Sequence, residues 1–211
     1  NKKFLIIGNT NAITYKEIFK LIKDDKIRTG YTNFNVGMFF VVPDNWEKYH
    51  HINEVGSKIA RVSTSCWFTN LEVKRHKEDM LLYKRYEGHE EDYPKYENYD
   101  AINVDQVKDI PTDYKGAIGV PITFVDKYNS AQFDIIALGI VGSIDFTNNR
   151  KMEILDKNGN PTGRITFNAK GTLYRRYNPQ IDHKAPAFRD VKTGELYSSI
   201  YARVIIKHKK L

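Results

Sequence analysis

The sequence predicts an α/β fold in which part of an open sheet with a helix is followed by a β-rich region of hairpins. Two observations predict it: the apolar run at residues 4–7 leads at once into a helical pattern, and turn signals recur after residue 145. The chain has 211 residues, of which 41% are hydrophobic, enough for one sizeable core or two small ones. Its 14 Tyr and 11 Phe argue against disorder, because disordered chains are poor in aromatic residues.

Several classes of protein are disfavoured by composition. No apolar run approaches the roughly 20 residues needed to cross a bilayer, and the first apolar stretch is too short for a signal peptide. The single cysteine, Cys66, cannot form an intramolecular disulfide, and no Cys and His spacing resembles a zinc site. We therefore expect a cytoplasmic protein that spans no membrane and holds no metal.

The net charge of +7 is concentrated in the last third of the chain. Residues 150–211 hold 14 Lys and Arg against 5 Asp and Glu, a net of +9, whereas residues 1–149 hold 19 against 21, a net of −2. Such a basic segment favours a polyanionic partner, most often nucleic acid. A basic surface that binds nothing is the alternative, and the charge alone does not decide between the two.

The first 28 residues predict a strand, a loop and a helix. Residues 4–7 are typical of a strand buried on both faces, as in a parallel sheet covered by helices. Thr14 and Glu17 have the spacing of a capping box, which starts a helix expected to reach about Arg28. The loop at residues 9–12 would lie at the carboxyl end of the strand, where open α/β sheets bind ligands. Its two asparagines are candidate site residues, with an ordinary turn as the alternative: Asn9 and Asn11.

The middle of the chain predicts further strands and one acidic loop. The strands are expected at residues 37–42, 59–71, 80–83, 119–124 and 133–138, although residues 70–79 could hold a helical turn instead. The last two are joined by a short connection, so they should pair antiparallel or share a capping turn at Asn129. The loop at residues 86–100 is rich in Tyr, Asp and Glu, and its charge would repel phosphate.

Hairpins dominate the prediction for the last third. Turn signals at residues 156–159, 160–163 and 192–195 separate short apolar segments, and a strand at residues 201–207 closes the chain. We therefore divide the chain into an α/β part with insertions, residues 1–145, and a basic β-rich part, residues 146–211. No Gly- or Ser-rich linker marks this boundary.

Self-contained catalytic motifs are missing. The sequence has no Gly-x-Gly-x-x-Gly, no phosphate-binding loop, no Gly-x-Ser-x-Gly and no His-Glu-x-x-His. Three histidines lie among polar residues and are expected to be solvated: His50, His51 and His76. No catalytic or metal-binding residue is therefore assigned in this chain.

Five separated blocks nevertheless resemble a known family in the family's own order. They lie at residues 3–17, 66–76, 99–111, 119–133 and 201–206. Together they resemble the EcoRI-type family of adenine-specific DNA methyltransferases. Five blocks in order are more specific than any single short motif.

The resemblance implies a larger enzyme with a Rossmann-like methyltransferase sheet. Family members hold S-adenosylmethionine with a Gly-containing motif on the first strand, and bind the flipped target adenine with an Asn-Pro-Pro-aromatic motif after the fourth. Neither motif is present, since the nearest strings, at Asn160 and Asn178, lack the second proline and the aromatic residue. The resemblance thus implies that residues 4–7 form the fifth strand, that an amino-terminal half is missing, and that the isolated chain is inactive.

On this resemblance the basic residues would contact double-stranded DNA, mainly at phosphates, which give affinity rather than sequence reading. The candidates are Lys74, Arg75, Arg164, Lys170, Arg175, Arg176, Arg203 and Lys207, with Lys209 and Lys210. Tyr174 and Tyr177 flank two of these arginines and suit groove edges or unstacked bases. Strand alternation equally allows the tyrosines to face a small core while the arginines are solvated.

The resulting hypothesis is part of an S-adenosylmethionine-dependent DNA adenine-N6 methyltransferase of the restriction-modification type. This chain would complete the sheet and recognise DNA. A non-catalytic DNA-binding module or decayed methyltransferase remnant is the alternative, and a basic scaffold that binds no DNA is a third possibility.

Overall fold

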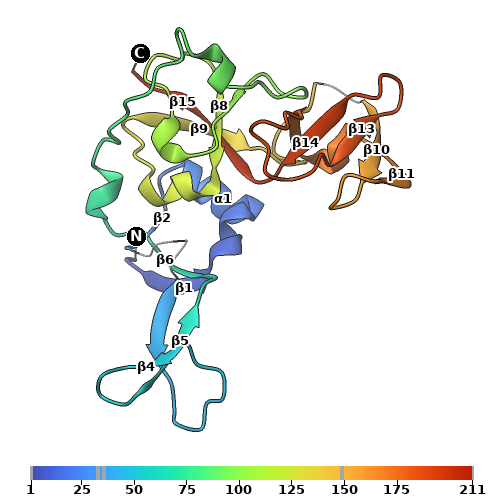
Figure 1. Ribbon diagram of the computed structural model, residues 1–211. Coiled ribbons are helices and arrows are strands. Elements are labelled where there is room, and N and C mark those ends of the chain that lie inside the picture. Colours follow the sequence, from blue (N-terminus) through green and yellow to red (C-terminus); the bar gives the residue numbers. More distant parts are fainter. Residues whose placement is uncertain (1, 32–33, 35–36, 148–149, 211) are drawn as a thin grey trace. The chain divides into compact units, whose positions relative to one another are not determined.

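The computed structural model describes residues 2–31, 34, 37–147 and 150–210 (Figure 1). Contacts divide the chain into two compact units: unit 1 comprises Asn1–Asp79 and Val125–Ser130, and unit 2 comprises Met80–Phe124 and Ala131–Leu211. Within the described residues, no helix has both the length and the apolar character needed to cross a membrane.

Unit 1 is built on a three-stranded sheet in the order β1 (Leu5–Asn9), β6 (Ser65–Thr69), β2 (Arg28–Thr29). The central strand, β6, is antiparallel to both neighbours, so β1 and β2 run in the same direction. The connection between them contains the 3-10 helix η1 (Thr10–Thr14) and the helix α1 (Lys16–Lys23). The core of this unit includes Ile13, Phe19, Ile22 and Phe68.

The strand β1 is confirmed, but its predicted burial is wrong. Leu5, Ile6 and Ile7 are 55%, 54% and 46% exposed. Among the described residues β1 pairs only with β6, in antiparallel register, and its other edge pairs with no described strand. The apolar pattern therefore belongs to a strand at the edge of this sheet rather than to one enclosed by parallel neighbours.

The helix after β1 starts and ends differently from the prediction. The Asn9 side chain accepts a hydrogen bond from the backbone N–H of Asn11 at 2.8 Å and caps η1. Thr14 does not cap α1, because its hydroxyl donates to the carbonyl of Asn11 instead. The helix α1 ends at Lys23, before the predicted end near Arg28.

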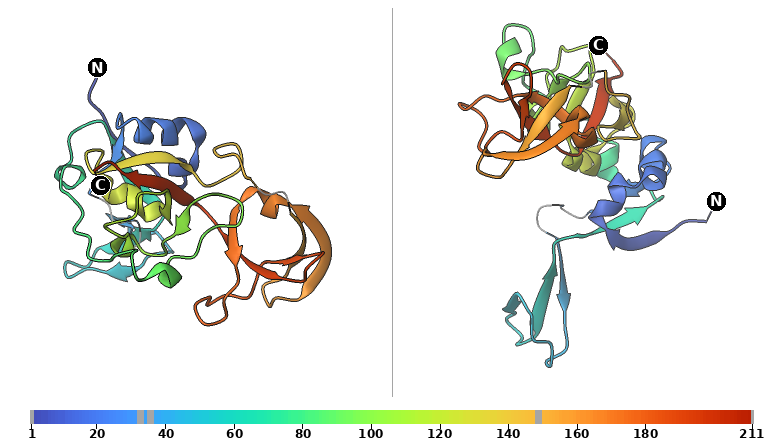
Figure 2. Two further views of the ribbon diagram at one scale, coloured as in Figure 1. Left: turned by 90° about the horizontal axis from the view of Figure 1, so that it is seen from above. Right: turned by 90° about the vertical axis from the view of Figure 1, so that its right-hand side faces the viewer.

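A second, smaller sheet extends from unit 1. Its strands are β3 (Met38–Val41), β5 (Lys58–Val62) and β4 (His51–Ile52), in that order and antiparallel (Figure 2). The strand predicted at residues 59–71 is thus two strands, β5 and β6, separated by a turn at residues 63–64.

Unit 2 begins with a four-stranded sheet in the order β7 (Ile102–Asn103), β8 (Ile118–Pro121), β15 (Arg203–His208), β9 (Phe133–Leu138). The predicted antiparallel pairing of β8 with β9 is wrong, because β15 lies between them and is antiparallel to both. The connection from β8 to β9 contains the 3-10 helix η5 (Ile122–Lys127). No strand forms at residues 80–83.

The second sheet of unit 2 has five antiparallel strands. Their order is β11 (Pro161–Phe167), β10 (Lys151–Leu155), β13 (Phe188–Asp190), β14 (Leu196–Ile200), β12 (Leu173–Arg176). The hairpins β10–β11 and β13–β14 confirm two of the predicted turns. The division expected near residue 145 falls inside unit 2, between its two sheets, and β15 returns to the first of them.

The other short elements are single turns of 3-10 helix. They are η2 (Lys74–His76), η3 (Glu90–Asp92), η4 (Val107–Asp109) and η6 (Asn168–Gly171). The last three of these lie in unit 2, with η4 leading toward β8 and η6 joining β11 to β12.

Because the side chains of β1 are exposed, substitutions in this strand should have little effect on the free energy of unfolding. Replacing Ile6 with Thr in this chain should change the free energy of unfolding by less than about 0.5 kcal/mol, because the side chain is already half in water. The matched change Ile13→Thr, at a residue that is 1% exposed, should cost about 2–4 kcal/mol. Urea denaturation measures both, and equal losses would contradict the edge position of β1.

Candidate nucleic-acid interface

Three acidic side chains in and beside the five-stranded sheet each pair with an arginine. Glu153 lies 2.5 Å from Arg189, Glu195 lies 2.6 Å from Arg176, and Asp182 binds Arg175. The basic residues left over in this region are mostly lysines. Those that are exposed and form no ion pair within the described residues are Lys151, Lys157, Arg164, Lys170, Lys184, Lys192, Lys207 and Lys210.

Arg175 is a structural residue in this sheet. Its side chain is 3% exposed, and its two terminal nitrogens lie 2.6 and 3.1 Å from the carboxylate of Asp182. The same carboxylate accepts hydrogen bonds from the Ser198 hydroxyl and the backbone N–H of Asn178. A phosphate would reach this guanidinium only if the pair opened, so we assign Arg175 to holding the loop after β12 against the sheet.

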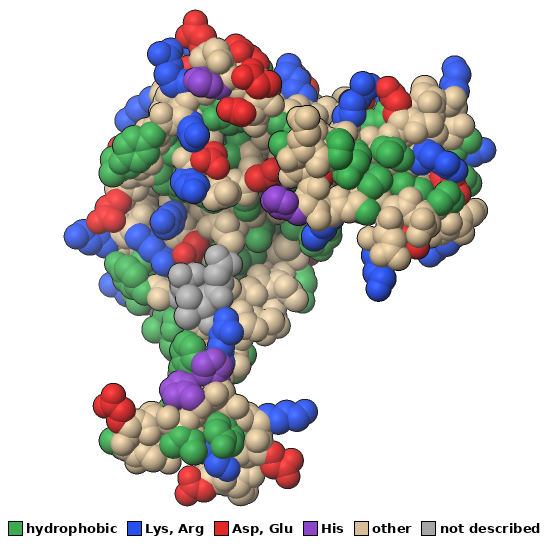
Figure 3. Space-filling model, viewed as in Figure 1, with side chains coloured by type: hydrophobic (Ala, Val, Ile, Leu, Met, Phe, Trp, Pro, Cys, Tyr) green, Lys and Arg blue, Asp and Glu red, His purple; other side chains and the backbone are tan. Residues whose placement is uncertain are grey.

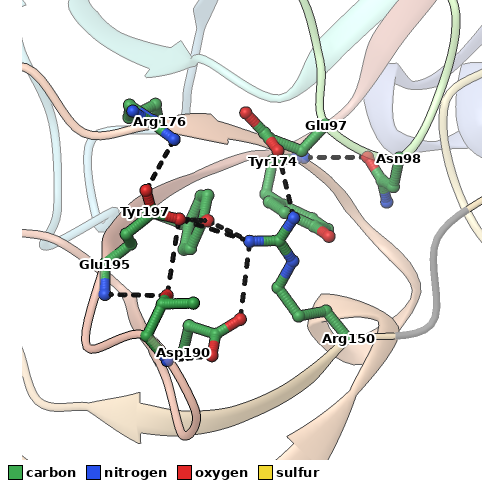
Figure 4. Close-up of polar contacts among 9 residues, drawn as sticks. Glu97, Asn98, Arg150, Tyr174, Arg176, Asp190, Glu195 and Tyr197 are labelled. Carbon is green, nitrogen blue, oxygen red and sulfur yellow. Dashed lines mark hydrogen bonds and ion pairs between the residues drawn. The ribbon is translucent and has the colours of Figure 1, made fainter.

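Arg150 and Arg176 belong to a network of charged and tyrosine side chains (Figure 4). The Arg150 guanidinium lies 3.4 Å from both Glu97 and Asp190, and 5.1 Å from the centre of the Tyr197 ring. The Tyr197 hydroxyl donates to Glu195, which also binds Arg176. Arg176 remains largely exposed at this edge of the sheet.

Tyr174 lies in the core rather than at a groove-facing surface. It is fully buried, and its ring packs edge-on against Tyr197 at a centroid distance of 5.3 Å. Burial raises the pKa of Tyr174 to about 12, so its hydroxyl stays protonated at neutral pH. Tyr174 therefore faces a small core, which was the alternative to contact with DNA. Tyr177 is half-buried just after the end of β12.

The two candidate DNA contacts on β15, Arg203 and Lys207, differ in whether they form an ion pair. Arg203 lies 2.6 Å from Asp105 and donates through Nε to Asn103, so it ties β15 to the segment at β7. Lys207 is exposed and forms no ion pair with a described residue, so it stays available for a phosphate.

Arg75 anchors the candidate basic turn of unit 1. Its guanidinium lies 2.6 Å from Asp126, donates to the carbonyl of Gly30, and lies 5.4 Å from the centre of the Tyr31 ring. Lys74, its neighbour, is 82% exposed beside Glu78. Of the two, Lys74 is placed to contact a ligand, and Arg75 to hold η2 in position.

His76 is buried, so the expectation that it is solvated is wrong. Its Nδ1 lies 2.8 Å from the carbonyl oxygen of Tyr128, and its Nε2 lies 2.9 Å from that of Thr29. Burial lowers the pKa of His76, and Arg75 acts in the same direction, while the two carbonyls oppose the shift. A neutral ring carries one N–H and can donate to only one carbonyl.

The loop of Asn9 and Asn11 is compact. Besides the cap from Asn9, the backbone N–H of Thr10 donates to the carbonyl of Thr64 at 2.7 Å, which fixes the loop to the turn between β5 and β6. Asn11 remains exposed. It is therefore the asparagine of the two that can turn toward a ligand at the carboxyl end of β1.

A mixed basic and apolar surface, here called the β11 surface, lies at the free edge of the five-stranded sheet. Phe167, 57% exposed, lies opposite Lys151 in the ladder, and the helical turn η6 follows directly. In η6 the backbone of Ala169 and Lys170 is left-handed, with φ of 46° and 58°, so Ala169 is buried while Lys170 is exposed. The surface comprises Lys151, Arg164, Ile165, Phe167 and Lys170.

Two of the predicted contacts lie at this edge, Arg164 on β11 and Lys170 on η6, with residues that sequence reasoning missed. Lys151, Ile165 and Phe167 share one face of the sheet, and Arg164 lies on the other. Lys151, Ile165 and Phe167 were detectable from the alternation within the two strands, but an exposed apolar position looks the same in sequence as a buried one. Figure 3 shows Lys and Arg side chains around the edge of this part of the molecule, with hydrophobic side chains between them.

The described residues contain no group of three or more His, Cys, Asp or Glu that could hold a metal ion. The cysteine, Cys66, is buried, and its pKa is raised to about 12 chiefly by that burial, so it is no nucleophile at neutral pH.

The buried ion pair predicts a large effect on stability. Arg175→Ala should lower the free energy of unfolding by about 3–5 kcal/mol, because it leaves the Asp182 carboxylate without its partner. Arg189→Ala is the matched control, since Arg189 pairs with Glu153 but is 44% exposed, and should cost at most about 1 kcal/mol. Urea denaturation of both variants is the measurement, and a small loss in Arg175→Ala would contradict its structural role.

The lowered pKa of His76 should make the free energy of unfolding depend on pH. Because its pKa is lowered in the folded chain, the unfolded chain binds more protons, and stability is lost as pH falls below the ordinary histidine value near 6.5. His208 has a lowered pKa for the same reason and contributes in the same direction. The midpoint of urea denaturation should therefore fall less between pH 7.5 and about 5.5 in His76→Gln than in the wild type. Parallel curves would contradict this assignment.

Comparison with known proteins identifies the family. The family model described as "Adenine-specific methyltransferase EcoRI" matches residues 1–209. The type II methyltransferase M.EcoRI of Escherichia coli is 48% identical over 139 residues, which cover 64% of this chain and 43% of that protein. M.MpnI of Mycoplasma pneumoniae is 38% identical over 140 residues, covering 64% of this chain and 44% of its own length. No solved structure matches the chain. Because the family model covers nearly all of it, the chain belongs to the EcoRI family of adenine-specific methyltransferases.

Proposed function

We propose that the chain is the carboxyl-terminal part of an S-adenosylmethionine-dependent DNA adenine-N6 methyltransferase of a cytoplasmic restriction-modification system. The observation that carries the proposal is the sheet of unit 1. β1 and β2 run in the same direction and are joined through α1, and β1 has an open apolar edge. An apolar strand with an unpaired edge suits a sheet that continues past it.

The relatives support a continuing sheet. The matched segment spans only 43–44% of the length of each relative, so this chain corresponds to only part of a comparable protein. In this proposal a strand from that portion pairs with the free edge of β1 and covers Leu5, Ile6 and Ile7.

The methyl donor would be held mostly by residues outside this chain. Among the described residues, the turn that follows β1 runs from Asn9 into η1 without a glycine, so it offers no Gly-rich cradle for the donor. The described residues therefore do not fit a complete S-adenosylmethionine site. Within the proposal, the chain's own contribution is the loop at residues 9–12, which presents Asn11 beside the site.

The basic residues divide by role in this proposal. Those that are exposed and not tied into the fold contact the DNA backbone: Lys74, Lys151, Arg164, Lys170 and Lys207. Arg175, Arg203 and Arg75 position the elements that carry them. Phe167 and Ile165 add apolar contact area beside the phosphate contacts.

Complementation tests the enzyme assignment. The 211-residue chain alone should transfer no methyl group from radiolabelled S-adenosylmethionine to duplex DNA. Mixed with the amino-terminal portion of the Escherichia coli relative, it should restore incorporation. Ile6→Lys should abolish the restored activity, because a charge would be buried where β1 pairs. Methyl transfer by the chain alone would contradict the proposal, and failure to complement combined with retained DNA binding would favour the non-catalytic module.

Salt titration tests the DNA contacts. The double variant Arg164→Gln with Lys170→Gln should weaken duplex binding and lower the slope of log affinity against log salt by about 2, since each phosphate contact contributes about 0.9. The control, Lys95→Gln with Lys108→Gln, removes the same charge from exposed positions near the other sheet of unit 2. Fluorescence anisotropy of a labelled duplex between about 50 and 200 mM salt gives both slopes. Equal slopes for the two double variants would contradict the assignment of the β11 surface.

A further inference from the structure

The small sheet of unit 1 has almost no core of its own. It comprises β3, β4, β5 and the loops between them, residues 37–62, and is called the ribbon below. Its only buried residue is Ile59. Sheets of this size are marginal unless a hydrophobic face is covered. The exposed large apolar side chains of the ribbon are Phe39, Val41, Trp46, Tyr49, Ile52, Val55 and Val62.

Both faces of the ribbon carry exposed apolar side chains. Phe39 and Val41 lie opposite Arg61 and Ile59 and share one face. Ile52 lies opposite Lys58 and shares the other face with Val62. A flat protein surface would cover one of these faces, whereas a groove contacts both at once.

The tip of the ribbon is held in a defined shape. Lys58 Nζ donates to the carbonyls of Asp44 and Trp46 and lies 5.1 Å from the centre of the Tyr49 ring. In the turn at residues 53–57 the Asn53 side chain accepts the backbone N–H of Ser57 at 2.8 Å. These contacts fix two loops that present apolar side chains to solvent: Trp46, 51% exposed, and Val55, 83% exposed.

The ribbon joins the three-stranded sheet of unit 1 at the end of that sheet where the proposed function places the site. The turn that joins β5 to β6 contains Thr64, whose carbonyl accepts the N–H of Thr10 at the start of η1. The left-handed Gly37 lies against the backbone of Val62 and Ser63, where a Cβ would not fit. The base of the ribbon is therefore fixed beside the loop that contains Asn11.

The charge of the ribbon suits contact with bases rather than phosphates. Lys48, Lys58 and Arg61 are balanced by three acidic residues, Asp44, Glu47 and Glu54, so its formal charge is zero. The major groove of DNA admits a β-ribbon, and proteins that open the base stack insert apolar side chains between base steps. Flipping a base has an unstacking cost that such an insertion offsets.

We propose that the ribbon enters a groove of double-stranded DNA beside the target adenine and that Trp46 stacks on the bases exposed there. The inference rests on the proposed function and adds the element that opens the duplex. The basic β11 surface would supply affinity, and the ribbon would supply the insertion.

A pair of duplexes tests the insertion with the chain as it stands. A fully paired 25-bp duplex is compared with the same duplex carrying one mismatched adenine, which is cheaper to unstack. The wild type should bind the mismatched duplex about fivefold or more tightly than the paired one, because insertion opens the stack. Trp46→Ala should lose this preference. Tyr83→Ala, which removes an exposed aromatic residue of unit 2, should keep it.

Quenching of tryptophan fluorescence by acrylamide gives an independent readout. Trp46 should become shielded when the duplex is added, and Trp46→Phe identifies its signal against that of Trp67. If Trp46 becomes shielded from acrylamide as the protein concentration rises, with no DNA present, a second copy of the chain covers the ribbon. That result would overturn the inference. DNA binding with neither shielding nor mismatch preference would overturn it while leaving the proposed function intact. No binding to either duplex at about 50 mM salt would instead overturn the DNA contacts of the proposed function, and the inference with them.

Discussion

The unpaired edge of β1 is the feature that most constrains what can lie beside the three-stranded sheet of unit 1. An edge strand presents a row of unpaired N–H and C=O groups, and natural sheets usually protect such rows with charges, proline or bulges. β1 instead carries three exposed aliphatic side chains along this edge. The compact loop with Asn11 and the base of the ribbon both lie at the carboxyl end of this strand. The strand proposed to pair with β1 would therefore also lie beside those two features.

Most cations of unit 2 that hold the fold are arginines. Arg175 and Arg150 form hydrogen-bonded pairs with carboxylates, for which the planar guanidinium is suited, while Arg164 and most lysines of the same region remain in solvent. A net charge counted along the sequence overstates the cations that can reach a ligand. The surplus on the β11 surface is smaller, but it lies beside exposed apolar side chains.

The two sheets of unit 2 are joined by packing as well as by chain. Leu173 of the five-stranded sheet packs in one buried cluster with Ile205 of the four-stranded sheet and with Tyr96 and Ala101. Between β14 and β15, Ala202 has a left-handed backbone with φ of 51°. The last strand therefore crosses from one sheet to the other within two residues and without a linker.

The sequence by itself determined the family, the strand positions that turn residues delimit, and the short loop after β1. These depend on local patterns: periodicity, turn chemistry and motif order. Only the tertiary structure decided that Leu5 to Ile7 are exposed, that His76 and Arg175 are buried, and that β15 lies between β8 and β9. The physical reason is that burial and strand pairing depend on distant partners. The carbonyl of Tyr128 that meets His76 is 52 positions away along the chain, and no local pattern encodes it.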